Sequence, residues 1–372
     1  AVSCVAMATT RALCICMAAL SVPASAALCG TPSSRSQISP SPRSRAAWSS
    51  WRRRGVYAGR EDILPLREIA ASVGVAAPWT APRWAWSLAW KCGHFALPLL
   101  HRWDPAAPAD TNVNLWVLWL KAIAGNRRRT ADGGLAYDML PSATRRVVCR
   151  PVAWLYPRLH HQNVALRTAF LDKVVKAEAE AGANSSTIVC VLGAGFDVRP
   201  FRLSTQPDVS WVEIDLPHVV GQKLSLLRRL RDRRPALAPQ IDAVRHVQAN
   251  LSHHEEMLAA LRDALSPFRQ TPTSTCSRRV VFVIEALMIY LPPAAAAALL
   301  ASAVEEAAAA GASSVSVCFA DRLPGAEGCS FQAARDVLAH AQLDLDESSW
   351  LPKPGLARHM GCARWAAATT ES

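Results

Sequence analysis

The stretch TIVCVLGAGFD occupies residues 187–197 and decides how the rest of the chain is interpreted. Its first six residues form a short apolar run rich in β-branched side chains, which is typical of a buried strand. The run stops at Gly193. Glycine allows a ligand to approach the backbone closely and tolerates positive φ, so Gly193 and Gly195 are candidate ligand-binding residues. A lone G-x-G is weak evidence, and it gains weight here because it directly follows the predicted strand.

Predicted strands and helices alternate on both sides of this stretch. Besides 187–192, strands are predicted at 209–214, 245–248, 280–284, 314–319 and 363–370. Helices are predicted from residue 112 onward and at 161–181, 217–232, 253–265 and 293–311. This alternation predicts an α/β fold, with a mostly parallel sheet covered by helices on both faces. In such sheets, ligands bind at the carboxyl ends of the strands.

An acidic residue, Asp215, ends the second predicted strand about twenty residues after the glycines. It can accept hydrogen bonds from both ribose hydroxyls of an adenosine cofactor. A dinucleotide also needs a third glycine where a helix begins, and Val198 stands at that position. Asp197 in the loop would repel a pyrophosphate but tolerate a sulfonium or an ammonium group. These residues favour S-adenosylmethionine over a nicotinamide cofactor.

Four ordered motifs point to one family. The stretch LGAGFDVRPFRL at 192–203 is joined by RTAFLD at 167–172, by EIDLP at 213–217 with Lys223 six residues later, and by EALMIYL at 285–291. Together they resemble the leucine carboxyl methyltransferase family over about residues 112–365. The resemblance implies a Rossmann-like class I methyltransferase fold with an N-terminal helical cap. It also implies S-adenosyl-L-methionine as the methyl donor.

The resemblance further implies which residues hold the methionine and ribose parts of the cofactor. Arg167 would pair with the methionine carboxylate, because a guanidinium suits bidentate carboxylate recognition. Gly193 and Gly195 would lie against the cofactor. Asp215 would hold the ribose hydroxyls.

The resemblance implies roles for four other residues, near the adenine and the methyl group of the cofactor. Asn250 and Leu251 would flank the adenine, although the family usually has aspartate at the first of these positions. Glu285 would sit beside the amino-acid end or the methyl donor, and Tyr290 would line the pocket. These last two are the predicted catalytic residues. Ala286 stands where the family often has glycine.

The predicted reaction is methylation of an oxygen nucleophile. A carboxylate is ionised at neutral pH and needs no general base, whereas a hydroxyl group needs one. His253 and His254 are candidate bases by residue type alone, which favours a carboxylate acceptor on a small molecule or a protein C-terminus. Two alternatives stay open. One is a nicotinamide-dependent oxidoreductase, and the other is an inactive cofactor-binding homologue.

The net charge of +12 is concentrated in residues 1–60, which contain eight arginines and no acidic residue. The rest of the chain has 33 basic and 29 acidic residues, so no nucleic-acid role is predicted. The eleven cysteines show no C-x-x-C pair and no zinc-ligand spacing, which predicts buried free thiols. No uncharged apolar run is long enough to span a bilayer.

Three regions are predicted from composition. Residues 1–60 combine an apolar segment, an Ala-Ser-Ala site at 24–26 and an acid-free Ser/Arg-rich segment, which resembles a plastid-targeting presequence. A secretory signal, a mitochondrial presequence and a disordered tail are the alternatives. Residues 61–150 are predicted to form a helical cap around the acceptor, and residues 151–372 the cofactor-binding domain.

Overall fold

The computed structural model describes residues 109–126, 134–142, 145, 158–181, 185–203, 208–270, 277–326, 330–351 and 359–366. The predicted presequence and the first part of the predicted cap lie outside these residues. Within the described residues, no helix combines the length and the apolar character needed to cross a membrane.

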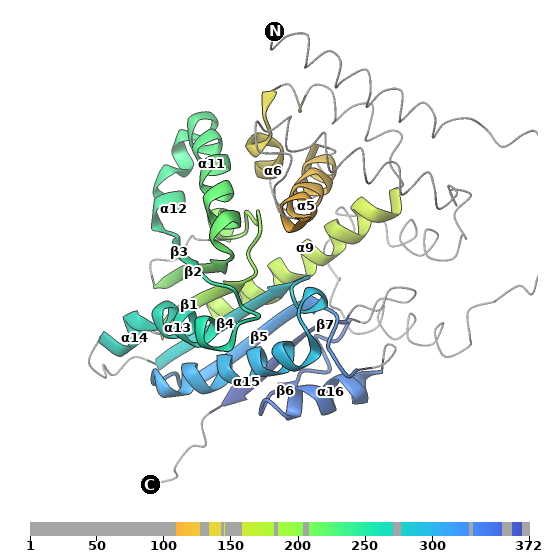
Figure 1. Ribbon diagram of the computed structural model, residues 1–372, viewed down its shortest axis with the longest axis vertical. Coiled ribbons are helices and arrows are strands. Elements are labelled where there is room, and N and C mark those ends of the chain that lie inside the picture. The colour runs from red at the N-terminus through yellow and green to blue at the C-terminus, as the bar shows by residue number, and fades with distance from the viewer. Residues whose placement is uncertain are drawn as a thin grey trace, which may run out of the picture.

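A seven-stranded sheet forms the centre of the molecule (Figure 1). Its order is β3-β2-β1-β4-β5-β7-β6, and only β7 and β6 introduce antiparallel pairs. The strands are β1 (Ser185–Leu192), β2 (Val209–Asp215), β3 (Arg245–Gln248), β4 (Ser277–Glu285), β5 (Ser314–Asp321), β6 (Asp344–Leu345) and β7 (His359–Ala366). The predicted mostly parallel α/β fold is confirmed.

The C-terminal part of the sheet differs from the prediction. The sixth predicted strand was placed at 363–370, whereas β7 spans His359–Ala366 and pairs along its whole length with β5. This pairing with β5 fixes the boundaries of β7, and local residue preference could not reveal them. β6 has two residues and was not predicted, because a strand that short has no detectable periodicity. The sheet therefore has seven strands, one more than the prediction.

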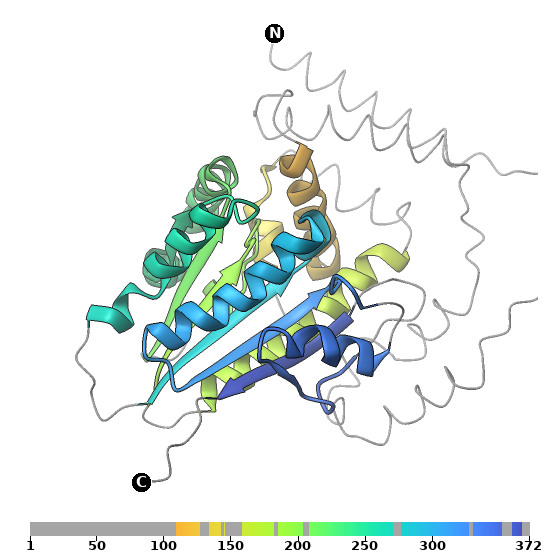
Figure 2. The same cartoon turned by 60° about the horizontal axis from the view of Figure 1, so that its bottom comes forward.

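Helices cover both faces of the sheet (Figures 1 and 2). One face is covered by α5 (Ala109–Asn126), α6 (Leu135–Met139), α9 (Arg158–Glu180), α10 (Pro200–Leu203), α11 (Pro217–Arg233) and α12 (Ala238–Ala243), which follows the short helix η2 (Pro235–Leu237). The other face is covered by α13 (His254–Ala264), α14 (Ser266–Gln270), α15 (Pro293–Ala309) and α16 (Phe331–Ala339). A short helix, η3 (Met288–Tyr290), follows β4.

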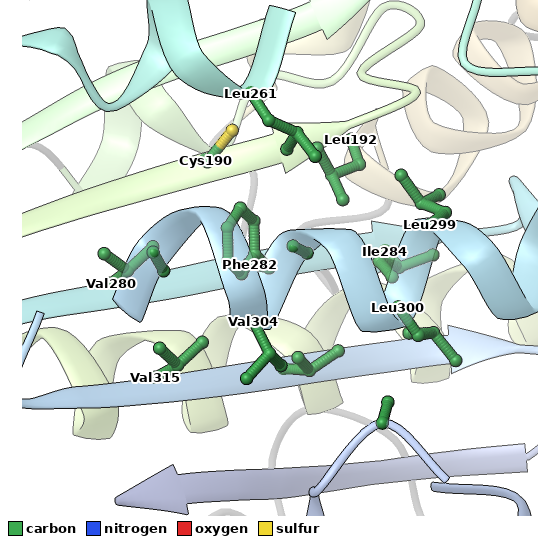
Figure 3. Close-up of a cluster of buried hydrophobic side chains, with 14 of the residues drawn as sticks. Cys190, Leu192, Leu261, Val280, Phe282, Ile284, Leu299, Leu300, Val304 and Val315 are labelled. Carbon is green, nitrogen blue, oxygen red and sulfur yellow. The ribbon is translucent and has the colours of Figure 1, made fainter. Parts of the chain in front are cut away.

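Residues of β1 alternate between two hydrophobic cores, as the period of a strand requires. Val189 and Val191 pack with α9 and α11 on one face, while Ile188, Cys190 and Leu192 pack with α13 and α15 on the other. Figure 3 shows part of this second core. Burial raises the pKa of the Cys190 thiol to about 12, so this cysteine behaves as a small apolar side chain.

Candidate active site

The glycine loop follows β1 at the carboxyl edge of the sheet. Gly193 and Gly195 have φ values of 63° and 47°, which disfavour other residues. A Cβ atom on Gly193 would lie 2.7 Å from Cδ1 of Leu287, and one on Gly195 would lie 2.7 Å from Oδ1 of Asn114. Both glycines are therefore required by backbone conformation and by close packing. The two glycines thus allow the side chains of Leu287 and Asn114 to pack closely against the loop.

Asp215, at the end of β2, is hydrogen-bonded to this loop. One carboxylate oxygen accepts from the backbone N–H of Gly195 at 2.6 Å, and the other accepts from that of Leu216 at 2.7 Å. The pairing of β1 with β2 places Leu192 beside Ile214, which brings the two strand ends together. Burial raises the pKa of Asp215, and the two N–H groups oppose that shift. Asp215 thus lies against the glycine loop, as the ribose assignment requires.

Five charged side chains, called here the charged cluster, meet beside the loop: Lys121, Arg167, Asp197, Arg199 and Glu285. Glu285 accepts from Arg167 Nε at 2.6 Å and from Arg199 Nη2 at 2.9 Å. The ammonium of Lys121 lies 3.4 Å from both Asp197 and Glu285. Arg199 also pairs with Asp197. All five side chains are largely buried, so their ion pairs are only weakly screened by solvent.

Arg167 has terminal nitrogens that form no hydrogen bond within the described residues. It lies on α9, is 5% exposed, and uses only Nε in its bond to Glu285. Its two terminal nitrogens donate to no group in the described part of the chain. A guanidinium presents these nitrogens as donors in a fixed plane, so they are available to bind a ligand oxygen.

The cluster keeps its two carboxylates ionised. Burial raises the pKa of Asp197, but the charges of Arg199 and Lys121 outweigh it and lower that pKa to about 2. Burial likewise disfavours ionisation of Glu285, yet Lys121, Arg167 and Arg199 hold its pKa well below the usual value. Glu285 is therefore a hydrogen-bond acceptor that orients cations and a poor proton acceptor during a reaction.

The charge of Asp197 is largely compensated in the structure, which differs from the prediction. Asp197 was expected to repel a pyrophosphate, but Arg199 and Lys121 largely compensate its charge in the structure. Two other features still disfavour a dinucleotide. Val198 is buried at the position of the third glycine, and the four-residue helix α10 begins only at Pro200. The glycine loop therefore does not lead directly into a long helix whose N-terminus could hold a pyrophosphate.

Three basic motif residues form ion pairs within the protein. Arg199 and Arg202 both donate to Asp172 on α9, at 2.9 and 2.6 Å. Lys223 on α11 binds Glu213 on β2 at 2.7 Å, and both side chains are buried. These pairs fasten α9 and α11 to the sheet, so parts of the family motifs are structural.

Three predicted residues belong neither to the charged cluster nor to the contact between Asp215 and the glycine loop. Asn250 follows β3, and its side-chain oxygen accepts from the backbone N–H and the hydroxyl of Ser252 at 3.0 and 2.7 Å. Leu251 is buried in the core beside α13. Tyr290 on η3 is 60% exposed. Contact of these residues with a cofactor or a substrate stays a prediction.

Two residues of α5 at the site were not predicted, Lys121 and Asn114. Both come from a helix far from the motifs, and they reach the charged cluster and the glycine loop. A signal was present for Lys121, because it is the one charged residue in the apolar run from Leu115 to Ala124. A lysine that is buried at such a position needs a partner, which is a reason to suspect a site.

Comparisons with known proteins agree with the motifs. Residues 127–304 match the family model described as leucine carboxyl methyltransferase, which confirms the resemblance over this stretch. A protein of Mycobacterium marinum is 39% identical over 95 residues, covering 26% of this chain and 27% of the relative. A protein of Frankia alni is 29% identical over 171 residues, covering 46% and 49%. Both are provisionally named S-adenosyl-L-methionine-dependent methyltransferases.

The chain thus spans between about a quarter and a half of the length of these two relatives. Among solved structures, the magnesium protoporphyrin IX methyltransferase of Synechocystis PCC 6803, which contains bound S-adenosylmethionine, is similar at 12% identity. The match covers 70% of this chain and 97% of that one, with a TM-score of 0.36. A score of this size adds nothing to the fold described above.

Proposed function

We propose that this protein is an S-adenosylmethionine-dependent O-methyltransferase, and the match of residues 127–304 to the leucine carboxyl methyltransferase model supports this proposal. The observation that carries the proposal is the guanidinium of Arg167. Its side chain is largely buried, and its two terminal nitrogens, which have no partner within the described residues, form a planar fork of donors. That fork matches the two oxygens of a carboxylate, which the methionine part of the cofactor carries.

The other site residues fit the same cofactor. The glycine loop has a backbone conformation that glycine adopts readily, and Asp215 contacts this loop through the N–H of Gly195, which supports a role for its carboxylate as acceptor from ribose hydroxyls. Glu285 holds Arg167 through Nε, so the unused terminal nitrogens keep one orientation. Lys121 and Arg199 add two further cations next to Glu285. We assign Arg167, Gly193, Gly195, Asp215 and Glu285 to cofactor binding, with Asn250 and Leu251 as candidates at the adenine.

S-adenosylmethionine supplies an electrophilic methyl group on a sulfonium, so transfer requires the acceptor oxygen in line with the methyl–sulfur bond. The residues described here would bind and orient the reactants. Holding two reactants in line can contribute roughly 7–11 kcal/mol to lowering a barrier. Glu285 is ionised and paired with three cations, which makes it an unsuitable base for an alcohol. An acceptor that is already ionised, such as a carboxylate, needs no base and is the acceptor we propose.

Calorimetry with S-adenosylmethionine and, separately, with NAD tests the cofactor assignment. We expect binding of the first alone, and binding of NAD alone would contradict the proposal. Arg167→Met should weaken S-adenosylmethionine binding about tenfold or more, because a charge-assisted hydrogen bond contributes about 1.5–3 kcal/mol. The control is Arg231→Met, which removes an exposed arginine on α11 that pairs with the exposed Asp242.

A transfer assay tests the reaction. Carboxylic acids and phenols are incubated with cofactor labelled in the methyl group, and base-labile label marks a methyl ester. We expect label in carboxylic acids. Stable label in phenols would move the acceptor class to hydroxyl groups. Tight cofactor binding without any transfer would support the alternative of an inactive homologue.

A further inference from the structure

A five-residue segment, called here the strap, comprises residues 286–290 and forms the first part of the connection between β4 and α15. It begins directly after Glu285 of the charged cluster and includes η3. Asp321, the last residue of the neighbouring strand β5, lies beneath it and is fully buried. Its carboxylate accepts from the backbone N–H groups of Leu287 and Met288, both at 2.6 Å, and from that of Ile289 at 3.3 Å.

Asp321 and the backbone N–H groups that it accepts from are called here the anchor, because these hydrogen bonds hold the strap in place. Three successive N–H groups can point at one carboxylate only if the chain turns tightly, and Ala286 has a φ of 55° as the turn begins. That conformation costs free energy for alanine and persists only where surrounding contacts enforce it. A fourth donor, the N–H of Arg322 at 2.7 Å, completes the set around the carboxylate. Burying an ionised carboxylate is tolerated when it is hydrogen-bonded this fully.

The side chains of the strap differ in their surroundings. The side chain of Leu287 packs against Gly193, so close that a Cβ atom there would collide with it. Ile289 and Tyr290 face outward and are 38% and 60% exposed. They are two of the three large hydrophobic side chains that are exposed among the described residues. The third is Leu224 on α11, which is 40% exposed.

We propose that the strap is the acceptor-facing element of the site, with Asp321 as its positioning residue and Ile289 and Tyr290 as contacts for an apolar acceptor. The exposed pair contributes nothing to the core, yet it lies within five residues of Glu285. Two neighbouring apolar side chains favour an acceptor with a hydrocarbon or aromatic body attached to its carboxylate. The inference rests on the proposed function and names the acceptor class for the same site.

The proposed contact of Ile289 and Tyr290 with the acceptor is tested first with the wild-type protein. A series of acids, from acetate through octanoate to cinnamate, is assayed for transfer of a labelled methyl group. We expect kcat/KM to rise with apolar size. The double variant Ile289→Ser, Tyr290→Ser should lose that rise through a KM increase of about tenfold for cinnamate. Its affinity for S-adenosylmethionine should stay unchanged. The control Leu224→Ser removes an equally exposed apolar side chain elsewhere and should change neither quantity.

The anchor is tested by hydrogen exchange, which needs neither cofactor nor acceptor. The amides of residues 287–289 should exchange slowly in the wild type and at least about tenfold faster in Asp321→Ala, while the amides of β4 stay protected. If Asp321→Ala does not fold, Asp321→Asn keeps one acceptor oxygen and should give an intermediate rate. Asp344→Asn, at a 79% exposed carboxylate, is the control.

The outcomes separate the two proposals. Equal exchange at 287–289 in the wild type and in both Asp321 variants would overturn the anchor. A double variant that keeps the preference for apolar acids would overturn the acceptor contact. If the wild type transfers no methyl group to any acid, the proposed function fails, and the anchor still stands or falls on the exchange rates.

Discussion

At the scale of single residues, the site depends on groups whose surroundings differ from those of ordinary surface residues. Asp215 accepts from the backbone N–H of Gly195 in the glycine loop and from that of Leu216, and Arg167 has two terminal nitrogens without a partner in the described part of the chain. Residue type alone does not distinguish them from a solvated turn aspartate or a surface arginine. Their burial and their hydrogen-bond partners make that distinction.

Asp215→Ala should weaken S-adenosylmethionine binding at least about tenfold, because the variant removes the carboxylate that we assign to the ribose hydroxyls. Calorimetry measures the change. Asp242→Ala, which removes an exposed carboxylate on α12, should leave the affinity as it is in the wild type. Unchanged affinity in Asp215→Ala would discredit the ribose assignment.

Ala286→Gly should raise the free energy of unfolding by about 0.5–1 kcal/mol. A positive φ costs alanine about 1–2 kcal/mol, and the greater entropy of glycine in the unfolded chain offsets part of the gain. Urea unfolding provides the measurement. Ala297→Gly, at an exposed position inside α15, has ordinary helical backbone and should instead lower stability by about 0.5–1 kcal/mol.

At the scale of elements, ion pairs inside the motifs fasten helices to the sheet. Lys223 joins α11 to Glu213 of β2, and Asp172 joins α9 to the arginines that follow the glycine loop. The strap after β4 is held in the same manner by Asp321. Motif residues of this kind therefore keep the elements around the ligand surface in position.

Lys223→Met should lower stability by about 3–5 kcal/mol, because it leaves Glu213 as a buried carboxylate that has lost its ammonium partner. The double variant Glu213→Gln, Lys223→Met should recover a large part of this loss. Chemical denaturation of the three proteins gives the comparison. The exposed pair Arg231–Asp242 serves as control, and its loss should cost less than about 1 kcal/mol. An equally small effect for Lys223→Met would mean that the buried pair does not stabilise the fold.

At the scale of the whole molecule, the charged cluster joins four separate parts of the chain. Lys121 comes from α5, Arg167 from α9, Asp197 and Arg199 from the loop after β1, and Glu285 from the end of β4. Its ionisation is therefore linked to global stability. A carboxyl group whose pKa is lowered on folding stabilises the native state above its unfolded pKa and loses that effect as the pH falls.

The free energy of unfolding should accordingly fall as the pH is lowered from about 4 to about 2. The pKa of Asp197 drops from 3.8 to about 2 on folding, which corresponds to about 2 kcal/mol, and Glu285 shifts in the same direction. Denaturation at a series of pH values measures the slope. Asp197→Asn should flatten it, whereas Asp344→Asn, at an exposed carboxylate, should leave it intact. A slope that is unchanged in Asp197→Asn would show that this group is not responsible.

The sequence by itself determined the alternation of five strands with their helices, the glycine loop and the family motifs. Those features are local, because strand periodicity, glycine conformation and the spacing of motifs are all recorded along the chain. It also indicated Arg167, Asp215 and Glu285, which the structure places at one edge of the sheet.

The tertiary structure alone decided the rest. It brought Lys121 and Asn114 to the loop, paired Asp197 with cations, set the boundaries of β7 and placed Asp321 beneath the strap. Each of these depends on contacts between segments distant in sequence, whose energies come from burial and charge pairing. No local pattern in the sequence records such contacts, so the charge that a residue such as Asp197 presents to a ligand follows only from the folded arrangement.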